Sequence, residues 1–180
     1  MPPARHRRYH PLSIAFHWLL ALLILGSLGV GLYMTGLPFS PQRLKLYNWH
    51  KWAGVVILLL SAARLLWRLA QPPPAPSPMP AWQRKAARGA HLALYVLFFA
   101  VPLAGWAYSS ASGFPIVLFA LLPLPDWVPV NRELAELLKP LHHYLAYALA
   151  AVIGLHVAGA LKHQFIDRDG LLQRMLPGRG

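Results

Sequence analysis

Four long stretches of the chain consist almost entirely of apolar residues, and the polar residues are gathered between them. A helix needs about 20 apolar residues to cross the hydrocarbon core of a bilayer. The pattern therefore predicts membrane-spanning helices at about 13–34, 47–69, 89–110 and 140–162. We expect an all-α protein in which residues 1–180 form a single membrane domain, a transmembrane four-helix bundle.

The segments between the expected helices differ in character. The linker 71–80 is rich in proline, which lacks a backbone donor and breaks helices, so we expect an extended connection there. The loop 111–139 holds an apolar stretch interrupted by prolines. It ends in the sequence NRELAELLK, which predicts a short amphipathic helix capped by Asn131. We interpret this loop as a lid on the outer face of the membrane.

Composition agrees with a membrane protein. Only 12% of the residues are charged, against about 25% in soluble domains. The absence of cysteine excludes disulfides, iron–sulfur clusters and cysteine-ligated zinc. A net charge of +12 would suit nucleic acid, but the basic residues cluster between apolar runs, and this arrangement points to lipid instead.

The basic residues also predict the orientation of the bundle. Twelve of the 17 Lys and Arg residues lie near the N-terminus, the second loop and the C-terminus. Basic residues are enriched on the cytoplasmic side of membrane proteins, so we expect both termini in the cytoplasm. The other five are expected on the outer side: Arg43, Lys45, Lys51, Arg132 and Lys139.

Six histidines fall inside the expected spans, where a polar side chain usually marks a functional site: His17, His50, His91, His142, His143 and His156. His142 and His156 are 14 residues apart, which places them about 21 Å apart along one helix and on the same face. His143 points away from this face. Consecutive helices run in opposite directions across the membrane. Depth therefore matches His17 with His156 on the inner side, and His50 with His142 on the outer side.

Two facing imidazoles at each of two depths predict two haems, since each iron would take one nitrogen from either side. Zinc is a poorer match because it requires three or four ligands that converge on one point. The alternative is that each histidine is an ordinary core or interface residue. That alternative explains a single position well, but it explains four at matched depths and faces poorly.

Further residues lie near the same two levels. Arg64 is 14 residues after His50 and is expected to pair with a carboxylate of the inner haem; alternatively, it is an interfacial arginine. Lys51 is a similar candidate at the outer haem. His91 is expected at the inner level, bonded to a haem carboxylate or a quinone, or in a structural role. Gly31 is expected at the outer level, where a missing side chain leaves room for a ring.

Several sequence segments together are typical of one protein family: RYHPLSIAFHW at 8–18, NWHKWAG at 48–54, ARLLWRL at 63–69, GAHLALYVLFFAVPLAG at 89–105 and LHHYLAYALAAVIGLHVAGALKH at 141–163. Over nearly its whole length the chain resembles the bacterial cytochrome b561 family of small di-haem membrane proteins. The resemblance implies two non-covalent b-type haems in the bacterial cytoplasmic membrane. It also implies that His17, His50, His142 and His156 are the ligands.

Within this family the chain is most similar to the superoxide oxidase type. That similarity implies an enzyme that takes an electron from superoxide outside the membrane and reduces ubiquinone. The five outer basic residues are then expected to attract the anion. Lys51 and Trp52 follow the second ligand, a pattern also found in family members with other donors. The alternative function is therefore an electron-relay cytochrome between a partner protein and the quinone pool.

Overall fold

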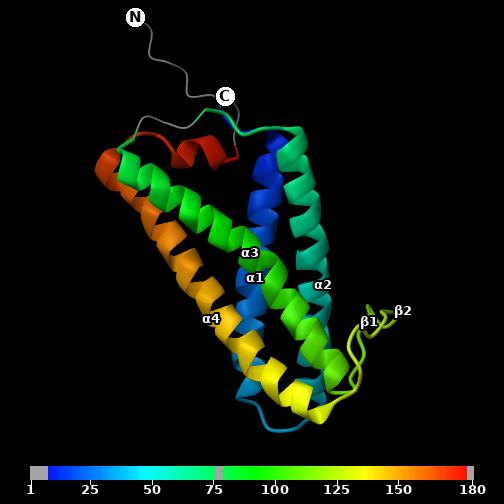
Figure 1. Ribbon diagram of the computed structural model, residues 1–180. Helices are drawn as coiled ribbons and strands as arrows, with labels where there is room; N and C mark the ends of the chain where they lie inside the picture. Colours follow the sequence, from blue (N-terminus) through cyan, green and yellow to red (C-terminus); the bar gives the residue numbers. More distant parts are fainter. Residues whose placement is uncertain (1–7, 76–78, 178–180) are drawn as a thin grey trace, which may run out of the picture.

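The structure, a computed structural model, describes residues 8–75 and 79–177. Its long helices are all apolar enough to cross a membrane, which confirms the predicted all-α bundle (Figure 1). They are α1 (Pro11–Thr35), α2 (Pro41–Ala70), α3 (Ala81–Ala111) and α4 (Arg132–Lys162). A π-helical turn, η1 (His163–Asp167), and a 3₁₀ turn, η2 (Leu172–Met175), follow α4.

Consecutive helices run in opposite directions, so the bundle has two distinct ends (Figure 1). We call the end where α1 and α3 begin the tail end, and the end where α2 and α4 begin the hairpin end. Helix α3 packs along α4, α1 along α2, and α2 against α3, whereas α1 and α4 make few close backbone contacts. The bundle is therefore joined through α2 and α3, and α1 and α4 approach each other mainly through side chains.

Three helices begin earlier than the apolar pattern predicts. Helix α2 begins at Pro41 rather than 47, α3 at Ala81 rather than 89, and α4 at Arg132 rather than 140. Capping explains two of these starts, because the side chains of Ser40 and Asn131 accept hydrogen bonds from the first turns of α2 and α4. An apolar pattern detects only the part of a helix that lies in hydrocarbon.

The sequence NRELAELLK is accordingly not a separate short helix. It forms the first turns of α4, and the helix continues through Pro140 without interruption. A proline inside a helix removes one backbone hydrogen bond, and membrane helices tolerate this loss where neighbouring elements support the chain. The loop between α3 and α4 is thus shorter than the predicted 111–139.

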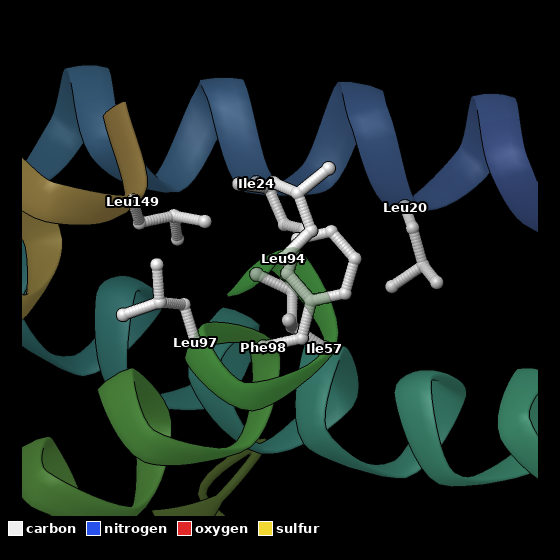
Figure 2. Packing of buried hydrophobic residues seen from close by; sticks show 7 residues of the cluster. All are labelled: Leu20, Ile24, Ile57, Leu94, Leu97, Phe98 and Leu149. Carbon is white, nitrogen blue, oxygen red and sulfur yellow. The ribbon is translucent and has the colours of Figure 1, made fainter. Parts of the chain in front are cut away.

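The apolar core lies at the middle of the bundle (Figure 2). Its side chains come from all four helices: Leu20, Ile24, Ile57, Leu94, Leu97, Phe98 and Leu149. Leu149 is seven residues from both His142 and His156, and Ile57 is seven residues after His50. Seven residues of helix span about 10 Å. The core therefore separates the two histidine levels.

The C-terminal segment folds back over the tail end. Trp18 donates its indole N–H to the carbonyl of Met175 at 2.7 Å, and the Tyr9 amide donates to the carbonyl of Arg174 at 3.3 Å. Arg174 is buried and also donates to the carbonyl of Ala75, within the proline-rich linker. Of the residues used to predict orientation, Arg5, Arg7 and Arg179 lie outside the described residues, as does the linker segment 76–78.

Between α3 and α4 the chain forms a small hairpin. Strands β1 (Val117–Leu118) and β2 (Leu122–Pro123) pair antiparallel, with Val117 opposite Pro123 and Leu118 opposite Leu122. Three residues, Phe119, Ala120 and Leu121, join the strands, and the first two have left-handed backbones with φ of 52° and 60°. This hairpin gives the hairpin end its name.

Candidate functional site

At the hairpin end, His50 of α2 faces His142 of α4. The centroids of the two rings are 6.1 Å apart and their planes are inclined by 82°. The Nδ1 atom of His50 lies 3.1 Å from the carbonyl oxygen of Ser27, and that of His142 lies 3.0 Å from the carbonyl oxygen of Val101. A carbonyl only accepts, so both Nδ1 atoms carry the proton and both Nε2 atoms keep a lone pair for a ligand.

A glycine makes room for each of these imidazoles. Gly31 lies one helical turn after Ser27, and Gly105 lies one turn after Val101. A Cβ atom at Gly31 would come within 3.2 Å of the His50 ring, and one at Gly105 within 2.8 Å of the His142 ring. Helices α1 and α3 thus use the same arrangement, a carbonyl at one position and a glycine four residues later. Gly31 lies at the predicted level, and the ring for which it leaves room is the imidazole of His50.

At the tail end, His17 of α1 faces His156 of α4. Their ring centroids are also 6.1 Å apart, with an angle of 62° between the planes. His91 of α3 adds a third ring, 5.5 Å from that of His156. Arg64 approaches His17 with Nη2 3.4 Å from Nδ1. A guanidinium is a cation that only donates hydrogen bonds. The tail-end pair is therefore bordered by a cation, whereas each ring of the hairpin-end pair is bordered by a carbonyl.

Two arginines of α2 surround the tail-end pair with positive charge. Arg64 and Arg68 lie one turn apart, and both guanidinium groups lie over the ring of Tyr95, at 5.8 and 5.4 Å. Within residues 8–75 and 79–177, neither forms an ion pair with a carboxylate. Two like charges so close together favour an anionic group at this level.

The distances within both pairs fit one metal ion held between two imidazoles. A metal–nitrogen bond is about 2.0–2.1 Å long and the ring centre lies about 1.1 Å beyond the nitrogen, so two rings on opposite sides of one ion have centres about 6.3 Å apart. The observed 6.1 Å agrees with this value. Beside the hairpin-end pair, an apolar cavity of about 60 Å³ is bounded by Gly54, Pro102 and Leu149. Paired imidazoles, apolar walls and nearby cations are surroundings that suit a haem.

The structure brings together the histidines that depth matching pairs, and it leaves His143 outside both pairs, beside His142. That they ligate haem stays a prediction. Lys51 donates from Nζ to the carbonyl of Phe114 at 2.9 Å, so its ammonium contacts the loop in this structure. The predicted role of Lys51 at a haem carboxylate also stays a prediction. Sequence reasoning missed Gly105 and the contact between His91 and His156.

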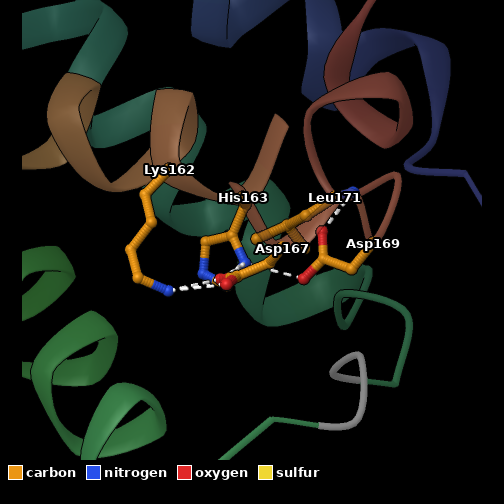
Figure 3. Close-up of polar contacts among 5 residues, drawn as sticks. All are labelled: Lys162, His163, Asp167, Asp169 and Leu171. Carbon is orange, nitrogen blue, oxygen red and sulfur yellow. Dashed lines mark hydrogen bonds and ion pairs between the residues drawn. The ribbon is translucent and has the colours of Figure 1, made fainter. Parts of the chain in front are cut away.

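A third histidine group lies after α4 (Figure 3). His163, Asp167 and Asp169 form a group of three in the described chain whose ligand atoms lie close enough together to hold a metal ion. However, Lys162 donates to both carboxylate oxygens of Asp167, and the Nδ1 atom of His163 lies 2.6 Å from Asp169. These contacts describe an ion-pair network that closes the π-helical turn η1.

Comparison with known proteins agrees with the geometry. The model of the prokaryotic cytochrome b561 family matches residues 8–178. "Cytochrome b561 homolog 2" of Escherichia coli (strain K12) is 38% identical over 94% of this chain and 91% of its own length. "Probable superoxide oxidase CybB" of Yersinia pestis is 34% identical over 96% of this chain and 97% of its own. "Cytochrome b561 homolog 1" of E. coli is 32% identical over 96% and 98%.

The match covers almost every residue of the chain, and the relatives are matched along nearly their full lengths. The family implies membrane electron transfer and b-type haem. Four apolar spans and bacterial relatives also support a multi-pass protein of the bacterial inner membrane. The chain therefore belongs to the prokaryotic cytochrome b561 family.

Proposed function

We propose that the chain holds two b-type haems and transfers electrons from superoxide to ubiquinone. In this proposal His17 and His156 hold the tail-end haem, and His50 and His142 hold the hairpin-end haem. The observation that carries it is the pair of opposed imidazoles at each end of the bundle, both with centroids 6.1 Å apart. Bound haem would supply a one-electron couple, which amino-acid side chains of this chain lack.

In this proposal the protein holds the haems, orients the histidines that bind them and keeps water away from the region between them. Ser27 and Val101 orient the hairpin-end imidazoles through their carbonyls. At the tail end, Arg64 and Arg68, which lie over Tyr95, would offset the charge of haem carboxylates, and His91, which contacts the His156 ring, would donate a hydrogen bond to one of them. The apolar core between the two levels excludes water. We expect Arg64 to turn from His17 towards a carboxylate when the site is loaded.

Basic residues support an anionic substrate at the hairpin end, which we propose faces the outside of the membrane. Arg43, Lys45, Lys51, Arg132 and Lys139 all belong to the helical turns nearest this end or to the level of His50. In the described chain, Arg132 is the member of this group with an ion-pair partner, Glu136. A net positive rim raises the encounter rate of a small anion. The name of the Yersinia relative points to the same substrate.

A second candidate function is electron relay between a partner protein and the quinone pool. It is favoured by a surface recess of about 380 Å³ at the hairpin end, between the end of α3 and the start of α4. Tyr108, Arg132, Glu136 and Lys139 line this recess and present charges of both signs. Mixed charge on a concave surface suits a protein partner better than it suits a small anion.

Stopped-flow mixing of the oxidised, purified protein with superoxide tests the proposed donor. We expect rapid growth of the reduced haem absorbance, and we expect its rate to fall as salt is added, because salt screens the attraction of the basic rim. Reversing the charge of Lys139 with Lys139→Glu should lower the rate at low salt. The matched control is Lys85→Glu, at the tail end. Reduction by quinol but not by superoxide would favour the relay function.

Histidine variants test the proposed haem ligands. His156→Ala and His17→Ala should each lower the haem content from about two to about one per chain and remove the same spectral component, since both histidines would be needed to hold the tail-end haem. His50→Ala and His142→Ala should remove the other component. Pyridine haemochrome assays and low-temperature spectra measure both quantities.

His143→Ala is the matched control for these variants and should keep the full haem content. If His156→Ala and His50→Ala removed the same spectral component, the pairing by level would be contradicted.

Glycine variants test the seat of the hairpin-end imidazoles. In Gly105→Ala the new methyl overlaps the His142 ring, and overpacking of this kind costs about 1–3 kcal/mol, or roughly 5- to 150-fold in affinity for the hairpin-end haem. Gly31→Ala should have a smaller effect because its contact distance is longer. Haem titration of the variants, followed by absorbance, measures the change.

Gly26→Ala provides the control, since a Cβ atom there meets nothing within 4 Å. Alanine forms helices better than glycine, so reduced haem binding in Gly105→Ala cannot come from weaker helix propensity. Equal haem affinity in the Gly105→Ala and Gly26→Ala proteins would show that the seat is not required.

A further inference from the structure

The hairpin between α3 and α4 is apolar along its whole length. From Phe114 to Pro125, twelve consecutive residues carry neither a charge nor a hydrogen-bonding side chain. Water-facing loops usually contain polar residues, and apolar runs of this length are otherwise found here only within the spanning helices. The composition alone therefore separates this segment from an ordinary solvent-exposed loop.

The hairpin lies against α2 rather than beyond the end of the bundle. The indole N–H of Trp52 donates to the carbonyl of Val117 at 2.7 Å, and the Trp52 ring lies 5.6 Å from that of Phe119. Trp52 is eleven residues into α2, which is about 16 Å along its axis from Pro41. Figure 1 shows the strands extending back along the bundle from the end of α3. The hairpin is thus at the level of His50, within a candidate span.

One side of the hairpin is held by protein, and the other is uncovered. Ile116 is only 3% exposed, whereas Phe119, Leu121 and Leu122 are 55%, 86% and 56% exposed. The spanning helices also expose apolar side chains, such as Leu59 of α2, which is 61% exposed. An uncovered apolar surface beside a candidate membrane span has acyl chains as its natural neighbour.

The residues of the turn at the tip of the hairpin also favour an apolar environment. Hairpin turns that need a positive φ strongly favour Gly, Asn and Asp, because these residues accept the left-handed backbone. Here the positions are taken by Phe119 and Ala120. Left-handed backbone costs about 1–2 kcal/mol per residue without glycine. Burial of the Phe119 ring in an apolar medium offsets that cost, whereas exposure of the ring to water would add to it.

The backbone of the hairpin is suited to a medium that is poor in water. Its amides are paired at the turn and the base: Ala120 N–H with Val117 O, Leu121 N–H with Leu118 O, and Leu124 N–H with Ile116 O. Pro115, Pro123 and Pro125 have no N–H to satisfy. Two outside donors, Lys51 and Trp52, serve the carbonyls of Phe114 and Val117. These pairings and the prolines reduce the number of backbone groups in the hairpin that would demand water.

We propose that residues 114–125 form a lipid-inserted hairpin that embeds Phe119, Leu121 and Leu122 among the acyl chains of the leaflet at the hairpin end. The hairpin then anchors this end of the bundle beside α2, and it is not a water-covered lid over the haem. The partner is the bilayer itself. This inference does not depend on the haem ligands or on the identity of the electron donor.

The absence of cysteine from the chain makes a depth measurement direct, because a single introduced cysteine carries the only spin label. Leu121→Cys and Leu122→Cys are labelled with a nitroxide in the full-length holoprotein, in phosphatidylcholine nanodiscs. Power-saturation EPR then compares collisions with oxygen, which concentrates in lipid, and with a water-soluble nickel chelate. Leu59→Cys is the lipid-facing reference, and Arg132→Cys, whose side chain is 92% exposed outside the apolar stretch, is the water-facing reference.

We expect labels at 121 and 122 to match the Leu59 reference, with frequent oxygen collisions and little contact with nickel. Nickel contact equal to that at 132 would overturn the proposal and favour a water-facing lid. Protection from both agents would also overturn it, because the hairpin would then pack against protein. An unchanged haem spectrum in every variant ensures that the comparison concerns folded protein.

Discussion

An imidazole inside an apolar bundle needs a partner for each of its two nitrogens, and this requirement governs how the helices fit together. At the hairpin end, the carbonyls of Ser27 and Val101 accept from Nδ1 of His50 and His142. The rings can reach these carbonyls only because Gly31 and Gly105 carry no side chain. With Nδ1 satisfied, Nε2 of each ring is left without a partner in the described chain, and under the proposed function a haem would complete the pairing.

The two histidine pairs have equal spacing but different surroundings. Carbonyl oxygens border the hairpin-end pair, and the guanidinium of Arg64 borders the tail-end pair, with Arg68 and His91 nearby. A hydrogen bond to a carbonyl makes an imidazole a stronger electron donor to its metal, whereas nearby cations favour the reduced, less positive centre. Under the proposed function this asymmetry favours electron movement from the hairpin end to the tail end. Such a direction suits a donor at one membrane surface and an acceptor nearer the other.

The outer surface of the protein faces the bilayer, where polar groups also need partners and apolar side chains are favoured. Apolar side chains that would be a liability in water cover the helices and the hairpin 114–125. Several polar groups near the ends of the spans are paired with the connecting segments. Trp52 and Lys51 serve loop carbonyls at the hairpin end, and Trp18 serves the carbonyl of Met175 at the tail end. Indole and ammonium groups thus fasten the connecting segments to the helices near both membrane surfaces.

The amino-acid sequence by itself determined the four spans and the levels of the paired histidines. Both follow from local quantities: the number of apolar residues in a row and the rise and turn of a helix. They sufficed to match His17 with His156 and His50 with His142 before any contact between helices was known. They also placed Gly31 at the correct level.

The tertiary structure decided what depends on how neighbouring helices are rotated and how closely they approach. Gly105 could not be matched with His142 from the sequence, because the contact joins α3 to α4 and requires the rotation of both. The contact of His91 with His156, the engagement of Lys51 by the loop and the position of the hairpin beside Trp52 were hidden for the same reason. The course of α4 through Pro140 was likewise settled by tertiary packing, since the local signal for a break at proline is strong and only surrounding contacts outweigh it.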